Sequence, residues 1–401
     1  MFQCSICSHK NYKFKLKLGK QPIVHHLLNN KKENYKLYDF NIVTCKKCAH
    51  IQIENPFDPK ILYQNYFVFS GSKNNQHIPL LIKQMTSSFN LNKDSKIFEI
   101  GCNDGHMLAD LKKNGFKNIS GIEPTKDAFG LAKKKVKNVY NDFFNQKFLN
   151  KKKLKNFDLI YSRQVFEHLY DLNDVLKAAH SMLKKKGKLM IEVPLHDMYF
   201  ENYDYTFWEE HVNYFTKNSL FNLLLRNKFR IFHHETILFS GKSIIIFAEK
   251  YEKKIKYTFN LSDEHKKIKS YFDKFNIFKK NLQNYLKSMK KKPFIYGCGC
   301  RSSNFVNFFG IGKLVECFVD DNRTKQNKIN PLNLLEIRKF NISKLKNRAV
   351  LLGVATEFEG ILIKKLKKHF KMDNIFSILP PSRILPPFWK NLINKNYKDI
   401  N

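Results

Sequence analysis

Short apolar runs alternate with longer amphipathic stretches through the middle of the chain. Residues 97–100 are mostly apolar, and the stretch that follows carries Met107, Leu108 and Leu111 at helical spacing. The same alternation predicts strands at 119–123, 157–162 and 188–193, a short strand within 139–144 that ends before Asp142, a helix at 218–226, and strands at 229–233 and 243–248. We therefore expect an α/β fold whose central seven-stranded sheet is mostly parallel and covered by helices.

A second alternation of this kind occupies the C-terminal part. A charged helical stretch at 263–292 leads to a strand, turn and helix at 293–309, with further strands at 315–321 and 350–354. This pattern predicts a C-terminal Rossmann-like α/β domain. Its turn, GCGCRSS, lacks the third glycine of a dinucleotide loop, which favours a scaffold without nicotinamide, although a dinucleotide site stays open. The expected domains are residues 1–78, 79–250, a helical connector at 251–290, and 291–401.

Two CxxC pairs stand in the N-terminal segment, formed by Cys4, Cys7, Cys45 and Cys48. Two such pairs supply the four thiolates of a closed tetrahedral zinc site, which has no open position for a reactant and is structural. The intervening stretch leaves room for a small β-rich insert. Disulfides are the alternative, but they need an oxidising compartment. We predict a small zinc-binding domain.

The composition limits the class of protein and its location in the cell. The chain has 401 residues, too many for one ordinary core, and its 43% hydrophobic content is that of a soluble globular protein. No apolar stretch is long enough to span a bilayer, and the N-terminus MFQCSIC has no pattern of a secretion signal. We expect a cytoplasmic protein without a membrane partner.

The formal net charge of +37 raises nucleic acid as a possible partner. However, only eight positions are arginine, the residue preferred for bidentate phosphate contacts, and the excess is lysine scattered among polar and apolar residues. This distribution favours a solvated surface over a nucleic-acid footprint. The charge would still attract an anionic small substrate.

The stretch KIFEIGCNDG at 96–105 is the first candidate site. A buried strand here runs into a glycine turn, where the backbone can approach a ligand closely. Unlike a GxGxxG loop, which presents amides to a pyrophosphate, it offers carboxylates. A ligand with an ammonium and a sulfonium, S-adenosylmethionine, suits it; an ordinary strand-to-helix turn is the alternative. The candidate cofactor residues of this loop are Glu99, Gly101, Asn103, Asp104 and Gly105.

Polar residues also follow the next strands. Glu123, some twenty residues beyond the glycine turn, can accept both ribose hydroxyls of an adenosine. Asp142 can accept from an adenine amino group, and Gln164 follows the fourth strand. Ligands of such sheets bind at the carboxyl ends of the strands. This agreement favours an S-adenosylmethionine site over isolated surface acids.

The loop after the fifth strand, HDMYFENYDYTFWEEHVNYFT, has the most reactive composition. It holds His196, Glu209, Glu210 and His211 among aromatic residues, and histidine is a natural general base. A core loop with hydrogen-bonded histidines is the alternative. A second aromatic segment, which includes Tyr66, precedes the central domain and is either a linker or an active-site flap.

The order of these motifs resembles the nucleotide-sugar methyltransferases, whose best-known members are C-methyltransferases of deoxysugars. The resemblance runs end to end and rests on the two CxxC pairs, EIGCNDG, GIEP, FDLIYSRQVFEHL, EEHVNYF, YGCGCRSSNFVNFFGIG and LGVATEFE. It implies a zinc-binding N-terminal domain, a central S-adenosylmethionine domain, and a Rossmann-like C-terminal domain that helps to hold the nucleotide sugar.

The resemblance also implies a mechanism. In members that methylate carbon, a histidine removes a proton beside the ketone of a 4-keto sugar nucleotide, and the enolate attacks the methyl group. By position, His211 is the base and Glu210 its neighbour, His168 follows the fourth strand, and Tyr66 lies in the flap. Two departures stand out: Trp208 replaces a common tyrosine, and Gln164 a common asparagine.

Four functions remain to be separated. We predict C-methylation of a nucleotide-linked sugar, in deoxysugar or surface-polysaccharide synthesis, by a chain that acts as a monomer. Because Trp208 cannot donate a phenolic proton, sugar O-methylation stays open. An RNA methyltransferase would show a basic aromatic groove, and a non-catalytic sugar-nucleotide binder would lack affinity for S-adenosylmethionine.

Overall fold

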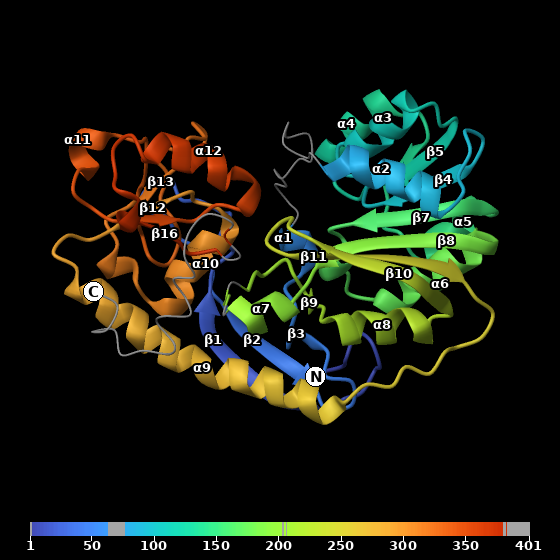
Figure 1. Cartoon of the computed structure of the whole chain (residues 1–401), viewed down its shortest axis with the longest axis horizontal. Coiled ribbons are helices and arrows are strands. Elements are labelled where there is room, and N and C mark those ends of the chain that lie inside the picture. The colour runs from blue at the N-terminus through green and yellow to red at the C-terminus, as the bar shows by residue number, and fades with distance from the viewer. Residues whose placement is uncertain (1, 63–76, 203, 206, 380–381, 383–401) are drawn as a thin grey trace.

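The computed structural model describes residues 2–62, 77–202, 204–205, 207–379 and 382. Figure 1 shows a small N-terminal sheet at the base, between two open α/β sheets, with the long helix α9 running beneath it from one α/β unit to the other. The predicted α/β class is confirmed: a small N-terminal unit with an antiparallel sheet, a central seven-stranded sheet and a C-terminal Rossmann-like unit.

The N-terminal sheet is antiparallel with the order β1-β2-β3-β9. Its fourth strand comes from the loop after the fifth strand of the central sheet, so residues far apart in the sequence complete one sheet. A short helix follows the third strand. The elements are β1 (Tyr12–Gln21), β2 (Tyr38–Cys45), β3 (Ile51–Ile53), β9 (Asn213–Tyr214) and α1 (Pro59–Leu62).

The central sheet has the seven strands that the alternation predicted, and their order is β10-β11-β8-β7-β4-β5-β6. It is parallel from β8 to β6, whereas β11 runs antiparallel to both its neighbours. The strands are β4 (Lys96–Ile100), β5 (Asn118–Ile122), β6 (Val139–Tyr140), β7 (Phe157–Arg163), β8 (Leu183–Pro194), β10 (Phe229–Ile237) and β11 (Ser243–Lys250).

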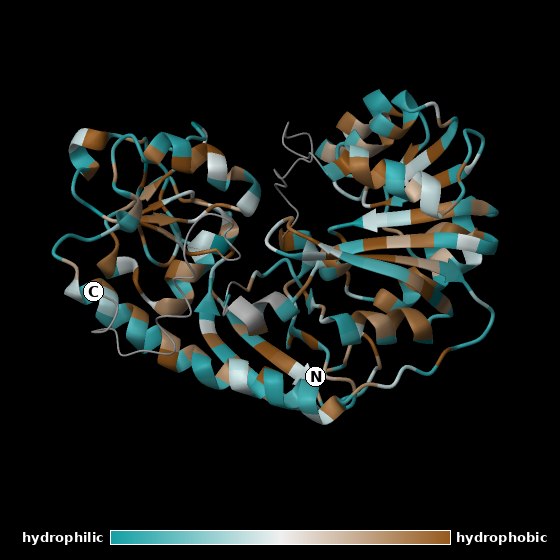
Figure 2. Cartoon of the chain, in the orientation of Figure 1, coloured by the Kyte–Doolittle hydropathy of each residue, from teal (hydrophilic) through white to brown (hydrophobic). Residues whose placement is uncertain are grey.

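Successive side chains of each strand point to opposite faces of this sheet, so both faces carry apolar residues and both are covered by helices. Leu159 and Tyr161 of β7 pack with α2, α3 and α4, whereas Ile160 packs with α5, α6 and α8. Figure 2 shows the matching concentration of hydrophobic residues on the strands. The helices are α2 (His77–Ser88), α3 (His106–Lys113), α4 (Lys126–Lys135), α5 (Gln146–Lys152), α6 (Leu172–Met182), α7 (Asp197–Asn202) and α8 (Lys217–Arg226), with the 3₁₀ turn η1 (Phe166–His168).

The C-terminal sheet is parallel, with the order β14-β13-β12-β15-β16, the arrangement of a Rossmann fold. It follows the 28-residue helix α9 (Leu261–Ser288). The remaining elements are β12 (Phe294–Tyr296), α10 (Cys300–Phe309), η2 (Gly312–Leu314), β13 (Phe318–Val319), β14 (Ile337–Arg338), α11 (Ile342–Leu345), β15 (Val350–Leu352), α12 (Thr356–Leu366), η3 (Met372–Asn374) and β16 (Ile375–Ser377).

One hydrophobic core joins the N-terminal and C-terminal units. Phe40 of β2, Tyr271 and Phe275 of α9, and Phe305 and Phe309 of α10 are buried in the same cluster. No helix within the described residues is both long and apolar enough to cross a membrane.

Candidate active site

The glycine turn after β4 is shaped by close backbone contacts. Gly101 has φ +68°, and a Cβ there would lie 2.5 Å from Cγ2 of Val165. Gly105 has φ +72°, and its Cβ would lie 3.0 Å from Ala132. Both positions therefore require glycine. The turn brings the backbone of residues 101–105 to the carboxyl end of the sheet.

Glu99 is the buried acid at the end of β4. It pairs across strands with Tyr161 of β7, whose hydroxyl donates to Oε2 of Glu99 at 2.9 Å. Burial raises the pKa of Glu99 to about 8, although the bond from Tyr161 opposes this shift. A cation beside this carboxyl would favour its ionised form.

Glu123 lies after β5 and holds the glycine turn from the side. Its Oε2 accepts from the backbone N–H of Asn103 at 2.9 Å, and its Oε1 accepts from the N–H and hydroxyl of Thr125 at 2.9 and 2.6 Å. Burial raises its pKa. Because each carboxylate oxygen has two lone pairs, the group can still accept ligand hydroxyls.

Three other predicted cofactor residues have partners within the protein. The Asp104 carboxylate turns to Lys135 of α4, with Oδ2 and Nζ 3.2 Å apart. Asp142 accepts from the N–H of Phe143 at 2.8 Å. Gln164, at φ +52°, donates to Glu192 and to Ser243, each at 3.1 Å.

A buried ion pair that no sequence motif indicated lies beside these strand-end residues. Arg163 ends β7, and its Nε donates to Oε2 of Glu192 on β8 at 2.9 Å. His77 of α2 accepts from Nη2 of Arg163 at 2.7 Å. Burial alone would raise the pKa of Glu192, but the Arg163 guanidinium lowers it to about 2. Only the parallel register of β7 and β8 places the two residues together.

The predicted base belongs to a compact aromatic and imidazole cluster. The rings of His211 and His168 stand 4.8 Å apart and perpendicular, and the indole of Trp208 lies 4.7 Å from His211. His168 donates from Nδ1 to the carbonyl of Glu210 at 2.9 Å, which fixes its orientation. Burial lowers the pKa of His168 to about 4 and that of His211 well below its usual value. Both imidazoles are therefore neutral.

The two acids before His211 are buried against the N-terminal unit. Glu209 accepts from the N–H of Val24 at 2.9 Å, and Oε1 of Glu210 lies 3.2 Å from Nδ1 of His25. Burial raises the pKa of Glu209 to about 7, and burial together with Glu209 raises that of Glu210 to about 9. The N-terminal unit thus contributes contacts that no motif indicated.

Helix α10 of the C-terminal unit holds the other side of the same loop. Arg301 forms an ion pair with the buried Asp204, and the amide of Asn304 donates to the carbonyl of Phe207 at 2.9 Å and to Glu209 at 3.3 Å. All three units therefore position the loop that carries His211.

A narrow cavity of about 20 Å³, room for about one water, borders His211. It is lined by Pro194, His196, Tyr199, Trp208, His211, Asn213, Tyr214, Ser240 and Arg301. A larger cleft of about 870 Å³ lies between the zinc-binding segment and helices α6 and α8, with no predicted catalytic residue in its lining. Tyr66, the predicted flap residue, lies outside the described residues.

The four predicted zinc ligands form one cluster. The sulfur atoms of Cys4 and Cys48 are 3.6 Å apart, those of Cys7 and Cys45 are 3.5 Å apart, and all four lie within 4.8 Å of one another. Tetrahedral Zn–S bonds of about 2.3 Å place sulfur atoms about 3.8 Å apart. The donors fit a structural zinc ion.

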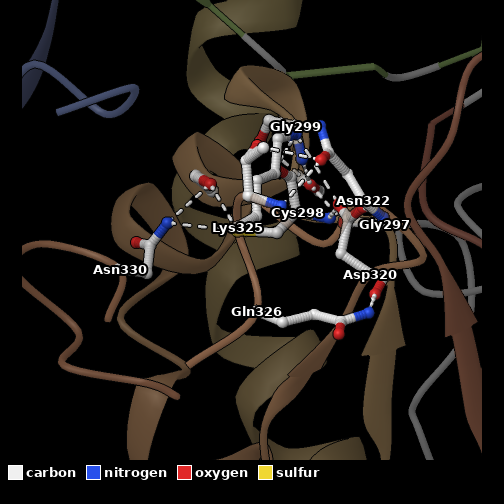
Figure 3. A network of polar contacts seen from close by, with 11 residues as sticks. Gly297, Cys298, Gly299, Asp320, Asn322, Lys325, Gln326 and Asn330 are labelled. Atoms are coloured by element: carbon white, nitrogen blue, oxygen red, sulfur yellow. Dashed lines mark hydrogen bonds and ion pairs between the residues drawn. The ribbon is translucent and has the colours of Figure 1, made fainter. Parts of the chain in front are cut away.

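The glycine turn of the C-terminal unit is occupied by its own side chains. Figure 3 shows Asp320, Asn322 and Lys325 gathered around Gly297–Gly299. The N–H of Cys298 donates to Oδ2 of Asp320, and Lys325 donates to the Cys298 carbonyl. A carboxylate of the chain itself therefore accepts from an amide of this turn.

Comparisons with known proteins agree with this arrangement. Family models match a zinc binding domain over residues 4–63, a methyltransferase domain over 75–234 and a C-methyltransferase C-terminal domain over 252–380. The central unit therefore has the fold of a methyltransferase domain. More narrowly, the chain resembles methyltransferases that join a zinc binding domain to a C-methyltransferase C-terminal domain.

Individual relatives are more distant. C-methyltransferase NovU from Streptomyces niveus is 24% identical over 61% of this chain and 60% of its own length. A tRNA U34 carboxymethyltransferase from Helicobacter pylori is 28% identical over 29% of this chain and 46% of its own length. This chain therefore spans less than two thirds of either relative. The N-methyltransferase NodS from Bradyrhizobium japonicum covers 46% of this chain and 90% of its own, at 15% identity and a TM-score of 0.36.

Proposed function

We propose that this protein transfers a methyl group from S-adenosylmethionine to a carbon of a nucleotide-linked sugar beside a 4-keto group. The observation that carries the proposal is the neutral pair of His168 and His211, on loops that follow the carboxyl ends of β7 and β8. The matched C-methyltransferase C-terminal domain and the similarity to NovU support carbon as the acceptor.

The cofactor residues are assigned by their chemistry. Glu99 is proposed to meet the positively charged amino acid end of the donor, and Glu123 its ribose hydroxyls. S-adenosylmethionine supplies a methyl group on a positively charged sulfur, which becomes a neutral thioether when the methyl group leaves.

Proton removal is assigned to His211. A neutral imidazole can take the proton of the carbon beside the ketone, while the C–H electron pair moves into the enolate. His168 packs its ring against His211, and its bond to the Glu210 carbonyl fixes the pair. Trp208 restricts water around the base through its apolar ring. Because the cavity beside His211 holds about one water, the loop must move to admit a sugar.

The test is product analysis with a panel of 4-keto nucleotide sugars and a donor labelled in its methyl group. Nuclear magnetic resonance of the product separates a C–CH₃ group from an O–CH₃ group. We expect the label on the carbon beside the ketone. Label on oxygen would replace this proposal by sugar O-methylation, and no label in any sugar would refute the substrate class.

RNA methylation is a second candidate because a tRNA U34 carboxymethyltransferase is 28% identical over 29% of this chain. The net charge of +37 would also favour it. It predicts tRNA binding that weakens steeply with salt. Absence of binding at low salt would exclude this candidate and leave the sugar proposal.

The setting of the reaction is part of the proposal. Nucleotide-sugar methylation fits deoxysugar or surface-polysaccharide synthesis in the cytoplasm, where thiolates of the cysteine cluster stay reduced. Fractionation of cells, followed by detection of the protein, tests this location.

A further inference from the structure

Glu167 stands out as a buried acid that the proposed reaction does not use. It lies in η1, directly before His168, and its side chain is 1% exposed. Within the part of the chain that the structure describes, neither carboxylate oxygen has a hydrogen-bond partner. Burying such a group without a partner is costly, so a ligand for it has to be considered.

The side chain points at the histidine pair. One oxygen of Glu167 lies 3.9 Å from Nε2 of His168. Donor atoms of Glu167, His168 and His211 all lie within 4.8 Å of one another. The set therefore combines one carboxylate with two imidazoles, a mixture that first-row transition metals prefer.

The orientation of His168 also suits metal binding. Its Nδ1 donates to the carbonyl of Glu210 at 2.9 Å. The neutral ring therefore carries its lone pair on Nε2, the atom that faces Glu167. A backbone carbonyl that holds the far nitrogen is a common support for a metal-binding histidine. Burial keeps both imidazoles neutral, the form that binds metal.

We propose that Glu167, His168 and His211 form a second metal site, which takes a divalent transition ion such as Co²⁺, Ni²⁺ or Zn²⁺ and is separate from the cysteine cluster. Metal–ligand bonds of about 2.0–2.2 Å require donors roughly 3.0–3.5 Å apart. The three side chains must therefore close by about 1 Å. Three protein ligands leave further positions for water.

A metal ion bound at this second site would affect the proposed reaction. A metal ion on His211 uses the lone pair that would take the substrate proton. The ion therefore inhibits turnover, and chelation restores it. This inhibition rests on the proposed function, whereas the binding itself does not.

The test measures metal binding without any turnover. The full chain, with its cysteine cluster filled with zinc, is dialysed against Co²⁺, and both elements are counted per chain by mass spectrometry. We expect one zinc and one cobalt. E167Q should weaken cobalt binding at least tenfold and keep its zinc. The matched control is E264Q, which changes another buried glutamate, on α9, and should bind cobalt as the wild type does.

Two results would overturn the second site: wild type that takes up no cobalt beyond its zinc, or E167Q that binds cobalt as tightly as wild type. If E167Q does not fold, X-ray absorption of cobalt bound to the wild type decides. Nitrogen and oxygen ligands at about 2.1 Å support the site, whereas sulfur ligands at about 2.3 Å mean exchange into the cysteine cluster and refute it.

Discussion

Burial sets the pKa values of individual acidic residues near the carboxyl ends of the strands. Glu99 and Glu167 have pKa values raised to about 8 because both carboxyls are removed from water. Glu192 is equally buried, but Arg163 beside it keeps its pKa at about 2. Residues of one type therefore differ in charge at neutral pH according to whether a cation is in contact. A cationic ligand in contact with Glu99 would lower the pKa of its carboxyl in the same way.

Binding of S-adenosylmethionine should therefore release protons from Glu99. Below pH 8 the free carboxyl is mostly protonated, and a cation beside it lowers its pKa. The affinity should fall as pH decreases from 8 to 6, by up to about tenfold per pH unit. Calorimetry in buffers of different ionisation enthalpy measures the released proton. Glu99→Gln should reduce the release, and an unchanged release in this variant would contradict the assignment.

Gly101→Ala should destabilise the protein by about 1–3 kcal/mol. The alanine would have to adopt φ +68° and place its Cβ 2.5 Å from Val165. Gly130→Ala is the matched control, because no atom lies within 4 Å of its Cβ and it sits in helix α4. The control should be neutral or more stable by up to about 1 kcal/mol. Equal effects of both substitutions in urea unfolding would refute the strained turn.

Single residues were predictable where a local pattern fixes them. The turn after β4 was marked by its glycines, and Glu99 was located at the strand end by its apolar neighbours. The orientation of Gln164 toward Glu192 and the pairing of Arg163 with Glu192 were not predictable. Both depend on the register of β7 beside β8, which no local sequence encodes.

At the scale of elements, the loop that carries His211 is tied to the zinc-binding segment. Strand β9 pairs with β3 through Asn213 and Gln52. The side-chain oxygen of Asn213 accepts from the hydroxyl of Ser5 at 2.7 Å, and Ser5 stands between two of the cysteine ligands. His50 contacts the same oxygen at 3.1 Å. The cysteine cluster therefore supports the loop from outside the active site.

Loss of zinc should consequently lower turnover. Cys48→Ser removes one of four ligands and should release the ion. We expect faster amide exchange at residues 212–214 and a loss of turnover, measured with the methyl acceptor found in the product assay. Cys317→Ser is the control, since Cys317 is also buried but lies outside the cluster. A zinc-free variant with unchanged exchange and turnover would contradict the coupling.

Element types were predicted better than element lengths. The short strand expected within 139–144, before Asp142, covers only Val139 and Tyr140. The Asn141 side chain then donates to the carbonyls of Glu123 and Pro124. The two-residue strand β9 was not predicted at all. Its pairing with β3 joins positions about 160 residues apart and leaves no periodic pattern.

At the scale of the whole molecule, the N-terminal and C-terminal units share one core. The ring of Phe40 on β2 lies 5.7 Å from that of Phe308 on α10. Helix α9 contributes a buried aromatic stripe to the same cluster. The sequence predicted a charged helical stretch here. It did not predict the buried stripe or its partners, because those partners come from two other parts of the chain.

Phe308→Ala should therefore destabilise both units together. Its side chain is 2% exposed, so truncation should cost about 3–5 kcal/mol. Hydrogen exchange should accelerate in β2 as well as in α10. Phe294→Ala is the control, since Phe294 is fully buried in a separate core of the C-terminal unit. Its effect should stay within that unit, and the same limited effect for Phe308→Ala would contradict a shared core.

The central claim, that His211 removes a proton from a sugar carbon, is tested most directly by solvent exchange. The protein is incubated in deuterated water with the 4-keto nucleotide sugar and S-adenosylhomocysteine, so that no methyl group can be transferred. The wild type should incorporate deuterium beside the ketone, and His211→Ala should slow this by about 10²–10⁴-fold while S-adenosylmethionine binding is kept. His180→Ala, which changes a histidine that contacts Tyr251 and Phe229 instead, should exchange as the wild type does. Exchange by His211→Ala at the wild-type rate would contradict the account.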